Sequence, residues 1–339
     1  MQRFVATKSE AFATASAKQI FEPIARELSL VEAEYERQVA SNIQVINYLG
    51  DYLRASGGKR VRPALFILSN YAVGGDGSSE KAIRMATVME MLHTATLVHD
   101  DIIDNADVRR NRPSINARFG NQTAVLMGDW LYMSAFHTSL RERSIEILDI
   151  LTELTRKMTE GEIIQMTRIG NLDITEDDYF DILKRKTAYL FSACCEIGAI
   201  LGGASSERQH ALRDFGMELG IAFQLFDDVL DITAESKELG KAAGSDLLEG
   251  KLTLPLIRLL SHRPEIRPKL ERVMLDGTYD PISREHLREM LDDHSVLKDI
   301  KHVAQTHVNA ARKSLDVLLK TEYRSSLEDT LDFVTARNN

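Results

Sequence analysis

The sequence predicts an all-α protein that folds as a single domain of ten or more helices over residues 1–339. Three observations support this prediction. Helix-favouring residues (Ala, Leu, Glu, Lys, Arg and Met) dominate, whereas the alternating Val, Ile and Thr runs of strands are scarce. Only 7 prolines occur in 339 residues, so helices can run long. Apolar residues recur at helical spacing, and no low-complexity linker or repeat divides the chain.

The elements follow from this spacing and from its interruptions. In chain order, helices are expected over about Gln19–Arg54, Ala64–Tyr71 and Ser79–Asp104, from near Ser114, Asn121, Ser144 and Thr175, over Phe215–Ala234, and in several amphipathic segments after Asp280. Breaks are expected at residues 56–58, 74–78, 111–113 and 240–250, where Gly, Pro, Asn or Ser gather. Pro63 is tolerated in a first helical turn, and Thr175 with Asp178 resembles a helix-start box.

Composition narrows the class of protein. The net charge of −9 argues against a general nucleic-acid binder, which needs an excess of cations. Cys194 and Cys195 are adjacent in an apolar run, where we expect two core residues and no disulfide. Residues 1–19 have no signal-peptide core, and no stretch reaches the roughly 20 apolar residues of a membrane span. We therefore expect a cytoplasmic protein with no transmembrane segment.

Two copies of the pattern D-D-x-x-D end apolar helical segments. Their aspartates are Asp100, Asp101 and Asp104 in the first copy and Asp227, Asp228 and Asp231 in the second. Positions i and i+4 of a helix face the same way, which would bring like charges together. Mg²⁺ compensates such charge, because it binds one or two carboxylates together with substrate phosphates. One copy alone is equally typical of a charged, solvated helix end, but two copies indicate two metal clusters.

Cationic and polar side chains gather near the same landmarks. They are Lys59 and Arg62 beside Gly57-Gly58, Arg109 and Arg110 after the first motif, Lys186-Thr187 in an apolar segment, and Lys241 and Lys251 after glycines. His93 lies two helical turns before Asp100, and Gln224 lies three residues before Asp227. Each cation alone is more commonly a solvated surface residue, and a lone His93 is more commonly structural. Together they indicate a site for diphosphates, which Arg binds as a fork and Lys as a point charge.

These segments together resemble the trans-isoprenyl diphosphate synthases, most closely the long-chain, octaprenyl-like members. They are GGKRVRP (57–63), HTATLVHDDIIDNADVRRNRP (93–113), GEIIQM (161–166), KT (186–187), FQLFDDVLD (223–231) and GKAAGSDLLEGK (240–251). The resemblance implies an isoprenoid-synthase-type bundle around a deep central cavity, usually as a homodimer. It implies sequential condensation of isopentenyl diphosphate onto an allylic diphosphate, farnesyl or geranylgeranyl diphosphate. About three Mg²⁺ ions per active site, with Mn²⁺ as a substitute, are implied as cofactors.

The resemblance also assigns roles to residues of this sequence. The six aspartates belong to the Mg²⁺ clusters, and with Lys186 and Lys241 they are the implied catalytic residues. The implied ligands of the isopentenyl diphosphate are Lys59, Arg62, His93 and Arg110. The implied ligands of the allylic diphosphate are Arg109, Lys186, Thr187, Gln224, Lys241 and Lys251. Asn111 stands where the family often has glycine, a turn position that changes little.

Product length is expected to depend on the helix that carries Asp100. Ala95 and Thr96, five and four residues before Asp100, are small where short-chain members often carry aromatic residues. We therefore expect an open tunnel and a product of about six to nine isoprene units, judged from the helical rise, for quinone side chains. Deeper candidates for the tunnel wall are Leu92, Met91 and Val88, and candidates for its floor, each equally typical of ordinary core, are Trp130, Met133 and Phe136.

Three alternatives stand beside this interpretation. The first is a shorter-chain farnesyl or geranylgeranyl synthase, which only product analysis distinguishes. The second is a non-catalytic subunit of a heteromeric synthase, but such subunits lose the Asp clusters or the Arg pair, and both are complete here. The third is a terpene cyclase, a class that commonly lacks GGKRVRP and the second D-D-x-x-D.

Overall fold

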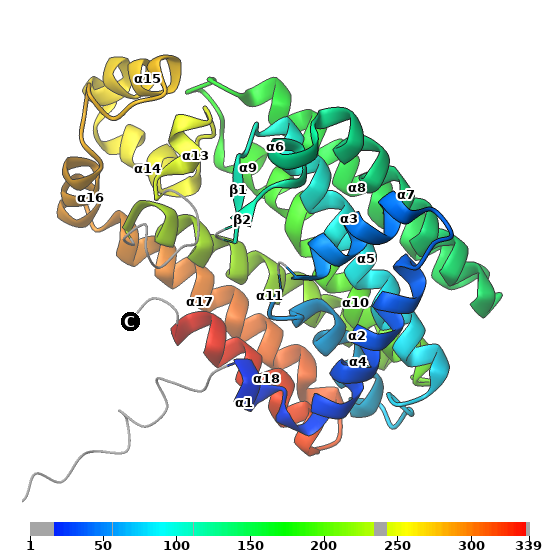
Figure 1. Ribbon diagram of the computed structural model, residues 1–339. Helices are drawn as coiled ribbons and strands as arrows, with labels where there is room; N and C mark the ends of the chain where they lie inside the picture. The colour runs from blue at the N-terminus through cyan, green and yellow to red at the C-terminus, as the bar shows by residue number, and fades with distance from the viewer. Residues whose placement is uncertain (1–16, 56, 111, 234–242, 337–339) are drawn as a thin grey trace, which may run out of the picture.

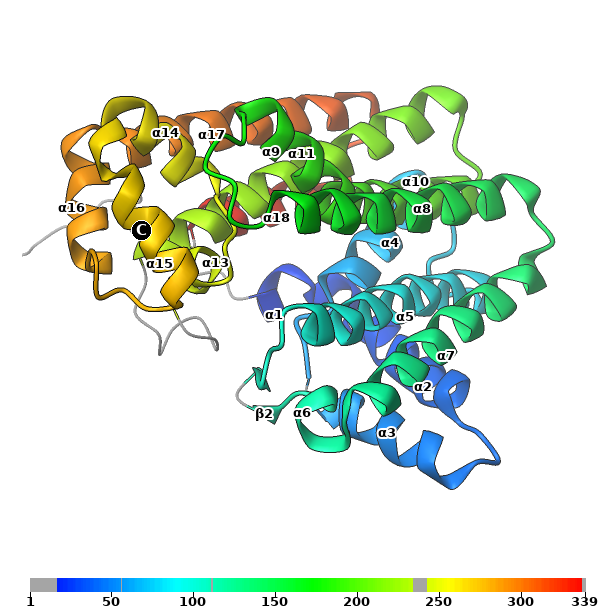
Figure 2. The ribbon, with the colours of Figure 1, turned by 90° about the horizontal axis from the view of Figure 1, so that it is seen from above.

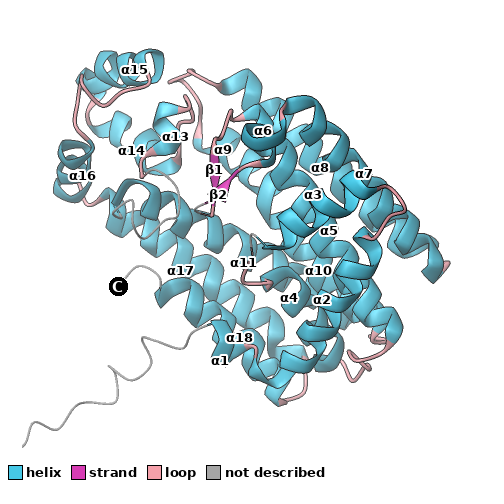
Figure 3. Cartoon of the chain, viewed as in Figure 1, coloured by secondary structure: helices cyan, strands magenta, loops and turns pink. Residues whose placement is uncertain are grey.

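The computed structural model describes residues 17–55, 57–110, 112–233 and 243–336, and this part of the chain is almost entirely helical (Figure 3). The strands described there are β1 (Val108–Arg109) and β2 (Arg112–Pro113), which pair antiparallel. The all-α fold predicted from the sequence is therefore confirmed. Among the described helices, none combines the length and the apolar composition that a membrane crossing requires.

The helices divide into two runs along the chain. Before residue 170 they are α1 (Ala17–Ile20), η1 (Glu22–Ile24), α2 (Ala25–Val39), α3 (Gln44–Ala55), α4 (Val61–Ala72), α5 (Glu80–Ile103), α6 (Ile115–Phe119), α7 (Asn121–Ser139), η2 (Leu140–Glu142) and α8 (Ile145–Arg168). After it they are α9 (Glu176–Leu183), η3 (Lys184–Ala188), α10 (Tyr189–Leu201), α11 (Ser206–Thr233), α13 (Ser245–Leu248), α14 (Leu254–His262), η4 (Pro264–Ile266), α15 (Arg267–Asp276), α16 (Arg284–Asp293), α17 (Val296–Ser314), η5 (Leu315–Val317) and α18 (Glu322–Ala336).

Local side-chain bonds explain where several helices begin and end. The helix expected over Gln19–Arg54 is divided near residue 41, because Asn47 accepts a hydrogen bond from the Ser41 N–H and donates one to the Ser41 carbonyl, both at 2.7 Å. The helix-start box at Thr175 is confirmed: its hydroxyl accepts from the Asp178 N–H at 3.1 Å, and the Asp178 carboxylate accepts from the Thr175 N–H at 3.1 Å.

Helices α5, α10 and α11 form the centre of the bundle. Helix α5 packs on α7, α2 and α4, while α10 lies between α4 and α11, and α11 is covered by α17 (Figure 1). Both ribbon views place α15 and α16 at one end of the molecule, away from α7 (Figure 2). Cys194 and Cys195 are free thiols buried in α10, as expected for core residues.

One close approach fixes α11 against the turn before α10. A Cβ built on Gly220 would lie 2.6 Å from the Ala188 Cα, so only glycine lets the two backbones meet there. Ala188 ends the η3 turn, which also carries Lys186 and Thr187. The contact therefore brings that turn beside α11, the helix that carries the second aspartate motif.

Candidate active site

A cavity of about 580 Å³ receives side chains from helices that are far apart in the sequence. Its acidic lining comes from α5 and its C-terminal cap, from α11 and from α13: Asp100, Asp104, Asp227, Asp228 and Asp246. Its cationic and polar lining includes Arg62, His93, Arg109, Arg110, Lys186, Thr187, Gln224 and Lys251. Its apolar wall includes Leu97, Ile182, Leu183, Leu190 and Phe223. The structure thus brings most of the predicted site residues around one space.

The lining of α5 is a single stripe of the helix. His93, Thr96, Asp100 and Asp104 follow one another at intervals of three or four residues, and all four border the cavity. Asp104 accepts a hydrogen bond from Lys251 Nζ at 2.8 Å. Burial raises the pKa of Asp100 to about 6, while nearby Lys186 opposes the shift. Two carboxylates therefore face the cavity from one turn of α5.

The central aspartate of the first motif has a different partner. Asp101 is buried and accepts a bond from Arg109 Nε at 2.5 Å. Burial raises the pKa of Asp101, and the charge of Arg109 opposes that rise. Asp101 thus holds the β1 strand instead of lining the cavity, although the sequence places it in the Mg²⁺ cluster.

The second motif is divided in a similar way. Asp227 borders the cavity, and Asp228 accepts hydrogen bonds from the Tyr179 hydroxyl at 2.6 Å and from Gln224 Nε2 at 2.8 Å. Burial, with Asp246 nearby, raises the pKa of Asp228 above its usual range. Asp231 lies outside the cavity lining, and its carbonyl accepts from the Gly244 N–H at 2.7 Å, at the turn before α13.

The carboxylates suit a metal that is shared with a phosphate. Within the described residues, no group of three or more His, Cys, Asp or Glu side chains forms a metal site by itself. Asp100 and Asp104 come from one helix and Asp227 from another, so each side offers one or two oxygen donors. Mg²⁺ commonly takes this number of carboxylates and fills its remaining positions with waters and substrate phosphates. The donor set therefore fits Mg²⁺ bound together with a diphosphate.

Arg62 and His93 form one cationic corner of the cavity. Arg62 Nη1 lies 3.0 Å from His93 Nε2. Burial and the charges of Arg62 and Arg110 hold the pKa of His93 well below its usual value, so the imidazole is neutral and accepts this bond. Arg62 Nε is buried without a hydrogen-bond partner in the described part of the chain. A buried donor of this kind is costly to stability, because its N–H has given up water without gaining a partner.

The glycine loop before α4 places the remaining predicted cations of this corner. Arg110 donates to the Gly57 carbonyl, and a Cβ on Gly58 would lie 2.8 Å from Arg110 Nη1, so the guanidinium packs directly on the loop. Lys59 lies outside the cavity lining, with Nζ 5.2 Å from the centre of the Phe333 ring of α18.

A second polar group lies where η3 meets α11. The Thr187 hydroxyl donates to Gln224 Oε1 at 2.9 Å, and Gln224 in turn donates to Asp228. Lys186 is paired with Glu162 of α8. Lys251 bonds Glu249 at 2.7 Å as well as Asp104. Lys241 and Asn111, which the sequence analysis also singled out, lie outside the described residues.

The predicted tunnel residues do not all reach the cavity. Thr96 lines it, whereas Ala95 and Leu92 are fully buried in the core and outside its lining. The reason is geometric, because consecutive residues of a helix point about 100° apart. Trp130 is half-buried against the core, and Met133 is 63% exposed on the outer side of α7. Neither residue borders the cavity.

Some lining residues had no assigned role in the sequence analysis. They are Gln165, Arg168, Tyr179, Leu190, Phe223 and Asp246. Gln165 lies within GEIIQM and Asp246 within GKAAGSDLLEGK, so these two segments carried the signal although neither of these two residues was chosen. Tyr179 stands in no motif, and its bond to Asp228 is visible only in the folded chain.

Known proteins resemble the chain in both sequence and structure. The profile of the polyprenyl synthetase family matches residues 43–291. Octaprenyl diphosphate synthase of Escherichia coli (strain K12) is 36% identical over 310 residues, which cover 91% of this chain and 95% of that protein. A short chain isoprenyl diphosphate synthase of Methanothermobacter thermautotrophicus is 34% identical over 322 residues, covering 93% and 98%.

Among solved structures, a polyprenyl synthase from Caulobacter crescentus CB15 superposes with a TM-score of 0.89 and 31% sequence identity. The superposition covers 96% of this chain and 98% of that one. That protein was crystallised in complex with calcium and isoprenyl diphosphate.

Proposed function

The chain belongs to the polyprenyl synthetase family and is a trans-polyprenyl diphosphate synthase, a prenyltransferase, and from this premise we propose that it makes a long-chain product. It would add isopentenyl diphosphate repeatedly to farnesyl or geranylgeranyl diphosphate until about six to nine isoprene units are joined, the length inferred from helical rise along α5. The product would supply quinone side chains. The observation that carries the proposal is one cavity that joins two aspartate motifs, several cations and an apolar wall.

The isopentenyl diphosphate is assigned to the corner formed by Arg62, His93 and Arg110. Support comes from the place of these three side chains on the cavity lining and from the neutral imidazole, which leaves the guanidinium charge for the ligand. Lys59 belongs to this set by its place in the motif, and it would have to leave the Phe333 ring to reach the ligand.

The allylic diphosphate is assigned to cationic and polar side chains of β1, η3 and α11 and of the segment around α13. These are Arg109, Lys186, Thr187, Gln224 and Lys251, together with Lys241, which lies outside the described residues. The proposed Mg²⁺ ligands are the aspartates of the two motifs that border the cavity, Asp100, Asp104, Asp227 and Asp228. When bound, the metal would neutralise the charge that develops on the departing diphosphate.

The side chains of this chain would then act at three points. Lys186 and Lys251 would stabilise the negative charge as the bond between the allylic carbon and the diphosphate oxygen breaks. The Arg62 corner would hold the double bond of isopentenyl diphosphate against that carbon, so that a carbon–carbon bond forms and a proton leaves, with the released diphosphate as the base. Leu97, Leu190 and Phe223 would keep water from the allylic cation.

The proposed assembly is a homodimer. Its support is one side of α7, where helical spacing brings together the exposed side chains of Val125, Leu126 and Met133. Apolar side chains gathered on one face are typical of protein–protein contacts.

Product analysis tests the proposal. The full chain is incubated with Mg²⁺, labelled isopentenyl diphosphate and farnesyl diphosphate, and the products are dephosphorylated and separated by chromatography. Products of six to nine units would support the long-chain assignment. Products that end at three or four units would show the shorter-chain activity, and no incorporation into the purified chain would indicate a non-catalytic subunit.

A further inference from the structure

The segment that carries Lys186 and Thr187 is a π-helical turn. It spans Lys184–Ala188, between α9 and α10. A π turn closes hydrogen bonds over five residues, and such turns are rare and are found mostly at functional sites. The extra residue in this turn changes which side chains face inward. Two residues of this turn, Lys186 and Thr187, border the cavity.

Helix α8 fits against this turn at one glycine. A Cβ built on Gly161 would lie 2.6 Å from the Arg185 Cβ and 3.3 Å from the Lys186 backbone nitrogen. Both atoms belong to the turn, one to its backbone and one attached directly to it. A methyl group at position 161 could therefore be accommodated only if the turn moved. Gly161 is buried in the middle of α8, where its low helix propensity would otherwise be a disadvantage.

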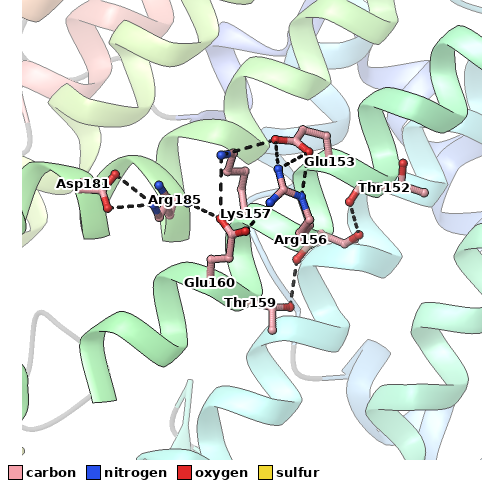
Figure 4. A network of polar contacts seen from close by, with 9 residues as sticks. Thr152, Glu153, Arg156, Lys157, Thr159, Glu160, Asp181 and Arg185 are labelled. Atoms are coloured by element: carbon pink, nitrogen blue, oxygen red, sulfur yellow. Dashed lines mark hydrogen bonds and ion pairs between the residues drawn. The ribbon is translucent and has the colours of Figure 1, made fainter. Parts of the chain in front are cut away.

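Ion pairs on both sides of Gly161 hold the same turn. Arg185 is bound by Glu160 of α8 and by Asp181 of α9, the latter at 2.9 Å. Figure 4 shows Arg185 between these two carboxylates, while Arg156 and Lys157 approach Glu160 from within α8 (Figure 4). On the other side of Gly161, Glu162 binds the ammonium of Lys186. Three consecutive residues of α8 therefore contact two consecutive residues of the turn.

We propose that Gly161 and Arg185 are positioning residues for the allylic diphosphate. They fix the π turn on α8, so that Lys186 and Thr187 stand at the cavity wall before substrate arrives, and Glu162 keeps the Lys186 side chain extended along that wall. Neither Gly161 nor Arg185 lines the cavity. The inference rests on the proposed function, because it needs Lys186 and Thr187 to be ligands of the allylic diphosphate.

The test is a comparison of two Michaelis constants in the full-length enzyme. Initial rates are measured while farnesyl diphosphate and isopentenyl diphosphate are varied separately, for Gly161→Ala, Arg185→Ala and Arg185→Lys. For Gly161→Ala and Arg185→Ala, we expect the KM for farnesyl diphosphate to rise about tenfold and that for isopentenyl diphosphate to stay within about twofold, as for loss of ground-state binding at one substrate. Arg185→Lys keeps a cation between Glu160 and Asp181 but loses the guanidinium fork that contacts both, so it should recover only part of the loss.

Two further variants make the outcome decisive. Thr159→Ala changes an exposed residue of α8 near Gly161 and should leave both constants unchanged. Circular dichroism and the melting temperature show whether each variant is folded, and if Gly161→Ala is not, the two Arg185 variants carry the test. Equal rises in both constants, or no change in either, would overturn the positioning role. If Lys186→Ala itself leaves the KM for farnesyl diphosphate unchanged, the proposed allylic site fails and this inference fails with it. If Lys186→Ala raises that constant and the Gly161 and Arg185 variants do not, only the inference fails.

Discussion

Replacing Thr96 by Phe should shorten the product, because Thr96 is the residue of the predicted tunnel wall that borders the cavity. It lies four residues before Asp100 on the same stripe of α5, which is about 6 Å along the helix axis. A phenyl ring at this height would block the path of the growing chain near its diphosphate end. We expect the product to fall from about six to nine units to about three or four, with the diphosphate ligands unchanged.

Ala95→Phe is the matched control, and the structure changes what is expected of it. Ala95 is completely buried in the core, so a ring there would overpack the interior and cost about 1–3 kcal/mol of stability. Thr96 is half-buried beside open space, and a larger side chain there can enter the cavity at little cost. Ala95→Phe should therefore lower the melting temperature more than Thr96→Phe does, and shorten the product less.

The assay is chromatography of dephosphorylated products from the wild type and both variants, with thermal denaturation in parallel. An unchanged product length in Thr96→Phe would refute the assignment of this stripe as the tunnel wall. Shortening by Ala95→Phe alone, without a loss of stability, would place the path on the neighbouring face of α5.

The remaining predictions concern the diphosphate sites and the buried network. Asp100→Ala should lower turnover about a hundredfold or more, because charge stabilisation in the transition state is lost. Undiminished activity of the wild-type enzyme in a chelator would contradict the metal assignment. In steady-state kinetics, Arg62→Ala should raise mainly the KM for isopentenyl diphosphate, and Lys186→Ala should raise mainly the KM for the allylic substrate. The reverse pattern would show that the two substrates are assigned to the wrong sites. Tyr179→Phe removes a buried hydrogen bond to Asp228 and should lower the free energy of unfolding by about 1–3 kcal/mol, measured by denaturant titration. An unchanged midpoint of unfolding would show that this bond does not stabilise the fold.

The sequence predicted the cavity stripe of α5 well, because helical periodicity is a local property. The spacing of His93, Asp100 and Asp104 placed these residues on one face, and the structure has all three around the cavity. Asp227 and Asp231 have the same spacing, but of these two only Asp227 borders the cavity. Asp231 lies one helical turn beyond Asp227, where its carbonyl accepts a hydrogen bond from the Gly244 N–H. How far a cavity extends along a helix depends on the neighbouring elements, which periodicity does not report.

Features that depend on two distant segments were not predictable from the sequence pattern. The π turn at Lys184–Ala188 reads as continuous helix in the sequence, and its fit against Gly161 requires α8 to lie beside it. The bond of Tyr179 to Asp228 joins residues 49 positions apart. The division of the first helical region near Ser41 depends on an asparagine six residues further on, a bond that composition alone does not indicate.

The orientation of Asp101 affects how the D-D-x-x-D pattern can be used to judge other sequences. Its carboxylate holds Arg109, and its carbonyl accepts from the Ala106 N–H at 2.9 Å and from Asn116 Nδ2 at 3.1 Å, so it anchors the segment that carries the arginine pair. A homologue with asparagine at this position would lose one letter of the pattern, yet it would keep an oxygen able to accept a hydrogen bond from the arginine. We therefore expect such a homologue to keep its arginine segment in place, so the loss of this aspartate alone does not mark a sequence as inactive.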